Sequence, residues 1–194
     1  MRLSAIRSVA VLGMALTLGA CASAPKSTPE TRATVSTVPD WFTKPPAADD
    51  RFYGVATSES RDMQLAVEKA AAASRGQIAQ QMEVKYGGVA KRFQEEVGAT
   101  NSELLDQFTT SYKLVSSQSL TGTRAKEQKI VPGEGSYRAY VLMEMPVGEA
   151  NKALMAKLAS QQALYTRFRS TQAFKELNEE LEKYEAANKP PVNK

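Results

Sequence analysis

Residues 136–145 read Ser-Tyr-Arg-Ala-Tyr-Val-Leu-Met-Glu-Met, and this stretch decides the expected architecture. Apolar and mixed positions alternate along it with the period of two that is typical of a β-strand. Tyr137, Val141 and Met145 belong to one set, and Arg138 and Leu142 belong to the other. Both sets are partly apolar, so we expect a strand in the middle of a sheet that helices cover.

Neighbouring segments supply partners for this strand. Residues 132–135 read Pro-Gly-Glu-Gly, a turn that leads back to a polar strand at about 120–131, near a sheet edge. Residues 52–58 read Phe-Tyr-Gly-Val-Ala-Thr-Ser and predict a first strand. Residues 84–97 fit either period, and we interpret them as a bent strand with a bulge at Gly87 and Gly88.

Helices are predicted between these strands and after them along the chain. Ser60 can cap a helix over about 61–82 that carries a face of small residues, including Ala66 and Ala70, which would let it lie close to a sheet. A capping box at 100–103 starts a second helix, and about 147–187 form a long C-terminal one. The fold class is therefore α+β: a small, mostly antiparallel sheet backed by helices, with a long C-terminal helix.

The first 20 residues have the composition of a secretory signal peptide. Arg2 and Arg7 precede an apolar run at 9–18, which is too short for a comfortable membrane span. This leader holds two of the 25 basic residues and none of the 21 acidic ones, so the mature chain carries a net charge of +2 rather than +4. Such a small charge argues against a nucleic-acid partner, which requires a concentrated basic face.

Leu18-Gly19-Ala20-Cys21 ends the leader with the only cysteine of the chain. The motif resembles the lipobox of bacterial lipoproteins, in which the cysteine is lipidated with acyl chains such as palmitate and becomes the new N-terminus. We expect Cys21 to be a membrane anchor, because burying acyl chains contributes about 0.8 kcal/mol per CH₂. By the same resemblance, Ala22 in place of Asp points to the periplasmic face of the outer membrane.

Four segments follow from these patterns. They are a signal peptide at 1–20, a lipidated N-terminus and flexible tether at 21–38, an α+β domain at 39–160, and a C-terminal helix extension and tail at 161–194. Trp41, at the start of the domain, is expected to be buried and to staple the chain onto the core rather than bind a ligand.

The composition argues against several kinds of chemistry. The chain has no histidine, which excludes histidine-based acid–base catalysis and histidine-ligated zinc, and one cysteine allows no internal disulfide. Glu95 and Glu96 would point to opposite faces of a strand and form a solvated edge. We expect no enzyme activity, no catalytic residues, no metal site and no cofactor.

The C-terminal segment carries an apolar stripe with 3-4-3 spacing, which we call the C-terminal stripe: Phe174, Leu177, Leu181 and Tyr184. A free helix this apolar would expose a patch that soluble monomers tend to avoid. Packing within the same chain and pairing with a second chain are both open, and the narrow, charge-flanked stripe favours self-association.

The motifs together resemble the twenty-kilodalton (Lpp-twenty type) outer-membrane lipoprotein family over about 39–146. The residues that carry the resemblance are Pro39, Trp41, Pro45, Pro46, Tyr53, Gly54, Val55, Ala56, Ala66 and Ala70. The resemblance implies a small α+β domain with no catalytic residues and no cofactor. Some members of that family build rings around the flagellar motor.

Two classes of function remain open at this point. The first is a structural or assembly lipoprotein of the cell envelope, with a homo-oligomer or another envelope protein as partner and with a flagellar association as one option. The second is a periplasmic binding module that regulates an envelope enzyme or partner protein.

Overall fold

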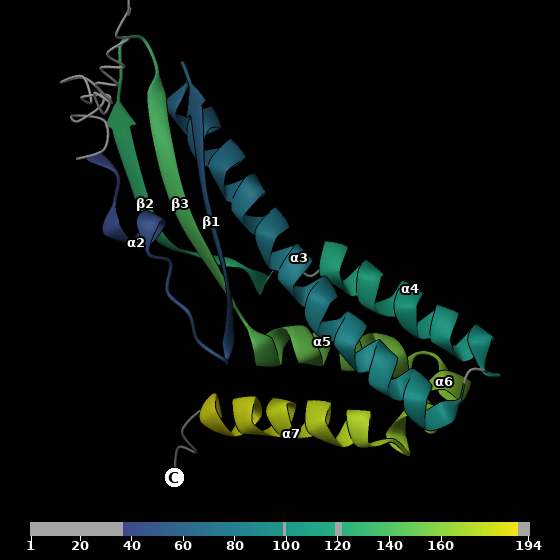
Figure 1. The fold of residues 1–194 in the computed structure, drawn as a ribbon. Coiled ribbons are helices and arrows are strands. Elements are labelled where there is room, and N and C mark those ends of the chain that lie inside the picture. The colour runs from purple at the N-terminus through teal and green to yellow at the C-terminus, as the bar shows by residue number, and fades with distance from the viewer. Residues whose placement is uncertain (1–36, 99, 119–121, 190–194) are drawn as a thin grey trace, which may run out of the picture. The chain divides into compact units, whose positions relative to one another are not determined.

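A computed structural model describes residues 37–98, 100–118 and 122–189, and Figure 1 shows how their helices and strands are arranged. The fold is α+β, as predicted: a three-stranded antiparallel sheet packs against helices, and a long helix ends the chain. In chain order the elements are α2 (Asp40–Thr43), β1 (Arg51–Ser60), α3 (Met63–Val97), α4 (Ser102–Gln118), β2 (Arg124–Pro132), β3 (Tyr137–Pro146), α5 (Val147–Ala159), α6 (Gln162–Arg169) and α7 (Gln172–Ala187).

The sheet has the order β1-β3-β2, so the strand with two partly apolar faces lies in the middle, as predicted. Both neighbours of β3 run antiparallel to it, and the register sets Val55 of β1 and Glu127 of β2 on either side of Leu142. A bulge between Ala125 and Glu127 interrupts β2, which is the exposed and mostly polar edge strand that its sequence predicted.

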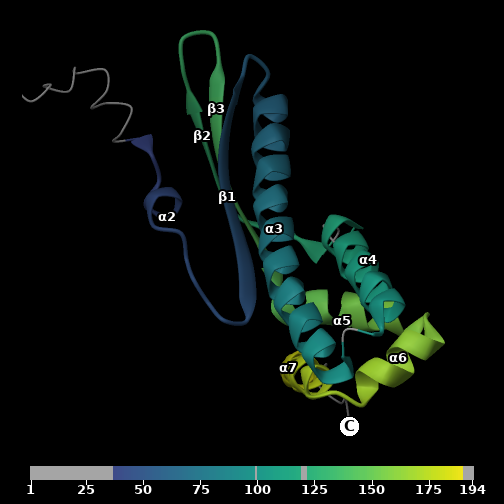
Figure 2. The same cartoon turned by 45° about the vertical axis from the view of Figure 1, so that its right-hand side comes forward.

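Helix α3 covers one face of this sheet (Figure 2). Its small residues allow a close approach, as expected: a Cβ at Gly54 would overlap the Ser74 carbonyl, and the Ser74 hydroxyl donates to the Val141 carbonyl at 3.0 Å. The cap differs from the prediction, because the Asp62 carboxylate accepts from the Leu65 N–H. Ser60 instead accepts from the N–H of Asp62.

The prediction of a bent strand over residues 84–97 is wrong, because α3 continues without a break to Val97. Tyr86, Val89, Phe93 and Val97 recur at helical spacing and are all buried. Two glycines in a helix cost about 1 kcal/mol each. Burying one large apolar side chain contributes about 1.5–3 kcal/mol, so burial of this face outweighs the cost of the glycines.

We expected one continuous helix over about 147–187. The structure instead has three helices there: α5, α6 and α7. Both breaks use a serine hydroxyl that bonds to a carbonyl three residues back: Ser160 to Lys157 and Ser170 to Arg167. Thr171 then caps α7 by accepting from the Phe174 N–H at 3.2 Å. These hydroxyl contacts end a helix without the Gly or Pro that usually signals an end.

Aromatic side chains tie the last helices to the rest of the core. Phe93 of α3 lies 5.4 Å from Phe108 of α4 and 5.4 Å from Phe168 of α6, measured between ring centroids. Phe174 of α7 joins them through Phe168 at 5.6 Å. Helices α6 and α7 therefore share the core of the compact unit that starts at Thr37.

The expectation that Trp41 is buried is wrong. Its side chain is half-buried in α2. The neighbouring Phe42 makes the contact with the sheet, edge-on to Tyr140 with 5.0 Å between centroids. The start of the domain is therefore attached to the sheet as expected, but Phe42 rather than Trp41 makes the main contact.

Candidate functional site

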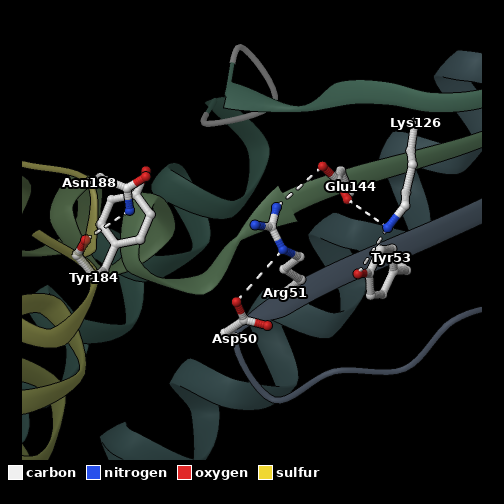
Figure 3. Close-up of polar contacts among 7 residues, drawn as sticks. All are labelled: Asp50, Arg51, Tyr53, Lys126, Glu144, Tyr184 and Asn188. Atoms are coloured by element: carbon white, nitrogen blue, oxygen red, sulfur yellow. Dashed lines mark hydrogen bonds and ion pairs between the residues drawn. The ribbon is translucent and has the colours of Figure 1, made fainter. Parts of the chain in front are cut away.

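A network of charges crosses the sheet on the face opposite α3 (Figure 3). The register places Tyr53 of β1 directly beside Glu144 of β3. Glu144 accepts a hydrogen bond from the Arg51 guanidinium at 3.2 Å and pairs with the Lys126 ammonium at 3.3 Å. Lys126 also reaches the Tyr53 hydroxyl at 3.5 Å and lies 5.0 Å above its ring. Side chains from all three strands thus meet at one carboxylate.

The electrostatics of this network favour fixed charges. The hydrogen bond to Glu144 is the main cause that raises the pKa of Lys126, and the hydrogen bond to Tyr53 adds to it. The raised pKa favours the protonated form of Lys126, which is the form that donates to Glu144. The network connects side chains of all three strands, so its geometry fits a role in stabilising the sheet.

A cleft of about 590 Å³ lies next to this network, where the start of α5 faces the end of α7. Its lining includes Arg51, Gly148, Lys183, Tyr184 and Asn188. The Tyr184 ring packs so closely on Gly148 that a Cβ there would overlap it. The Tyr184 hydroxyl donates to Glu149 at 2.8 Å. The Asn188 amide donates to the Tyr184 carbonyl, as Figure 3 shows.

A polar chain runs from the core to Glu180 in the wall of this cleft. The Tyr86 hydroxyl donates to the Asn151 side chain at 3.1 Å, and both residues are 0% exposed. Asn151 donates to Glu180 at 2.8 Å, and Glu180 pairs with Lys85 at 2.8 Å. Burial would raise the pKa of Glu180, but hydrogen bonds from Lys85 and Asn151 lower it overall. Burial raises the pKa of Tyr86 far above its usual range. The chain connects α3, α5 and α7.

A second cleft of about 480 Å³ lies between α4 and the α5–α6 junction. Polar side chains such as Glu103, Asp106 and Lys157 line it. Two of its lining residues bond to each other: the Gln161 amide donates to the Ser111 hydroxyl at 2.6 Å. Among the residues that the structure describes, no group of three acids, histidines or cysteines could hold a metal ion in either cleft.

Glu95 and Glu96 lie on helix α3, not on a strand edge, and Glu96 has a role that the sequence did not indicate. Its carboxylate accepts from the backbone N–H groups of Gln172 and Ala173, at 2.7 and 3.1 Å. It thereby satisfies free donors at the start of α7 and places a negative charge at the positive end of that helix. The partners lie 76 and 77 residues apart in sequence, so only the tertiary fold reveals this contact.

The C-terminal stripe packs within its own chain. Leu177 is 2% exposed and belongs to the core. Phe174 and Leu181 are half-buried against the core, and Tyr184 is half-buried over Gly148. The exposed patch on which the expectation of self-association depended is therefore absent.

Cys21, the predicted lipidation site, lies outside the described residues. Between residues 37 and 189, with the gaps at 99 and 119–121, no helix has the length and hydrophobicity to cross a membrane. The sequence matches no known family model and no curated protein.

Proposed function

We propose that this chain is a non-enzymatic lipoprotein, held on the periplasmic face of the outer membrane through Cys21, with a structural or assembly role in the cell envelope. The observation that carries the proposal is the Leu18-Gly19-Ala20-Cys21 motif directly after a basic and apolar leader. Two or more acyl chains at Cys21 would anchor the domain stably, whereas one chain alone binds membranes only marginally.

The bonding of the acidic side chains supports a structural role for the domain. Glu144, Glu180 and Glu96 each accept hydrogen bonds from partners on other elements of the fold. A carboxylate held in this way ties elements together, whereas a general acid or base needs a pKa near the working pH and access to a substrate proton. The network in Figure 3 therefore has the properties of a scaffold.

Capture of partners from solubilised envelopes tests the assembly role. The wild-type chain is compared with Cys21→Ser, which carries the same domain without the anchor. We expect the wild type to recover further copies of itself or structural envelope proteins, and flagellar basal-body proteins would specify the role. Recovery of one enzyme in stoichiometric amount would contradict an assembly role.

A periplasmic binding module is the second candidate, and the cleft between α5 and α7 favours it. Its volume of about 590 Å³ lies within the range of ligand pockets, about 300–1,000 Å³. Lys183 lines this cleft and is exposed. If the protein regulates an enzyme through the cleft, Lys183→Glu should lose that enzyme in the capture experiment and Lys175→Glu, elsewhere on α7, should keep it.

A further inference from the structure

The two edges of the sheet differ in how they are protected. Along β1, the Gln77 amide of α3 accepts from the Val55 N–H at 2.9 Å and donates to the Val55 carbonyl at 2.8 Å. Gln81 donates to the Tyr53 carbonyl at 2.6 Å. These two side chains occupy backbone groups that a further strand would need, so the β1 edge is closed to strand addition.

The β2 edge lacks such a cover. In the described part of the chain, β2 is hydrogen-bonded to β3 and to no other strand. Helix α3 lies over β1 and β3 and scarcely touches β2 (Figure 2). Glu127 and Lys129 are exposed, and neither forms an ion pair within the described residues. Both lie on the sheet face away from α3, beside Leu142 and Tyr140 of β3.

The sequence of β2 complements itself in one register. Two copies of a strand that pair antiparallel are related by a twofold axis normal to the sheet, and facing residues then lie on the same side. The axis must therefore lie between the two copies of one residue, which face each other. An axis at Glu127 or Lys129 sets like charges opposite each other, and an axis at residues 124–126 falls on the bulge. An axis at Ile130 or Val131 sets Pro132, which has no N–H, opposite Gln128 or Ile130. An axis through Gln128 sets Glu127 opposite Lys129 twice.

We propose that two copies of this chain pair through their β2 edges about an axis at Gln128, which joins the two sheets into one of six strands. Each Glu127 then faces the partner's Lys129. Residues before and after Gln128 face each other symmetrically, so the bulge between Ala125 and Glu127 limits the ladder to the few residues around Gln128, and the interface is small. This inference gives the proposed assembly role a partner, a second copy of the chain. It rests on the proposed function, because anchoring in one membrane raises the effective concentration at which two copies meet.

Oxidative cross-linking of the full-length chain in isolated envelopes tests the register. Facing residues in an antiparallel pair have Cα atoms about 4.5–5.5 Å apart, within the range of a disulfide. Gln128→Cys should therefore form a dimer. The two copies of Val131→Cys would be separated by six residues of strand, about 20 Å, and should not. The wild type, with Cys21 as its only cysteine, controls for disulfides at that site.

Charge exchange in the Gln128→Cys chain tests the contact itself. Glu127→Lys and Lys129→Glu should each lower the dimer yield about tenfold, because each replaces two attractive pairs by two repulsive ones. The double variant should restore the yield. Absence of cross-linking, equal cross-linking of Val131→Cys, or no recovery in the double variant would overturn the proposal. Sedimentation of the same envelopes reports anchoring separately, so failure of the dimer and failure of the anchor are distinguishable.

Discussion

At the scale of single residues, Trp41 shows how the structure changes an expected energy. Full burial of an aromatic side chain would make its replacement by alanine cost about 3–5 kcal/mol. Trp41 is only half-buried, whereas Phe93 is 0% exposed. We expect Trp41→Ala to lower the free energy of unfolding by about 1–2 kcal/mol and Phe93→Ala by about 3–5 kcal/mol, measured by urea denaturation. Equal losses would contradict this assignment of the core.

Tyr86 makes stability depend on alkaline pH. Burial, and then the negative charge of Glu180, raise the pKa of Tyr86 in the folded protein. The neutral form is therefore favoured by folding, and its contribution to stability is complete below the unfolded pKa of about 10. It declines as pH rises above that value.

Urea unfolding between pH 8 and pH 11 checks this dependence. We expect the free energy of unfolding of the wild type to fall with pH in the upper part of this window. Tyr86→Phe should be less stable at pH 8 by about 1–3 kcal/mol, because the buried Asn151 oxygen loses its donor. It should also show a smaller alkaline decline, and an unchanged decline would place the titrating group elsewhere.

At the scale of elements, two glycines should respond in opposite directions. Gly88 lies inside α3, where an added Cβ would meet nothing within 4 Å. Gly88→Ala should therefore stabilise the protein by up to about 1 kcal/mol. Gly148→Ala should destabilise it by about 1–3 kcal/mol, because the new methyl group would overlap Tyr184. Thermal melting of the two variants checks both signs, and a stabilised Gly148→Ala would show that α7 does not pack on α5 as described.

Helix α7 should act as part of the core. Leu177→Ala removes a buried side chain and should cost about 2–5 kcal/mol, whereas Glu179→Ala on the exposed side of the same helix should change stability by less than about 0.5 kcal/mol. For the same reason, removal of residues 171–194 should unfold the domain rather than release a stable monomer. A folded truncated chain, seen by circular dichroism, would contradict the packing of the C-terminal stripe in its own chain.

The sequence predicts those elements whose residues follow a single period. The alternation at 136–145 identified β3 as the central strand, and the polar composition before it identified β2 as an edge. Residues 84–97 do not follow a single period, because Val89, Phe93 and Val97 fit both and two glycines favour a break, so the sequence predicts a strand where the structure has a helix. The ends of α5 and α6 carry no Gly or Pro signal in the sequence, because serine hydroxyls terminate them.

The candidate site was less predictable than the fold. Glu144 pairs with basic side chains of β1 and β2. Gln77 of α3 bonds to the backbone at the outer edge of β1. These contacts join residues far apart in the chain, so they depend on tertiary packing that no local pattern contains. Cys21 is the opposite case, because its motif is entirely local and can be read from four consecutive residues.

At the scale of the whole molecule, the proposal describes a folded α+β domain that acyl chains at Cys21 would hold at the outer membrane. From residue 37 to residue 189, apart from the positions left out at 99 and 119–121, no helix could cross a bilayer. Attachment would then depend on acyl chains at Cys21, and the domain would remain free to pair with a second copy beneath the membrane.

Fractionation of cells that carry Cys21→Ser tests this central claim most directly. Wild-type chain and variant are expressed at equal levels, and membranes are separated on a density gradient. We expect the wild type to sediment with the outer membrane and the variant to appear in the soluble fraction with its domain still folded. A variant that still sediments with the outer membrane would contradict the assignment of Cys21 as the anchor.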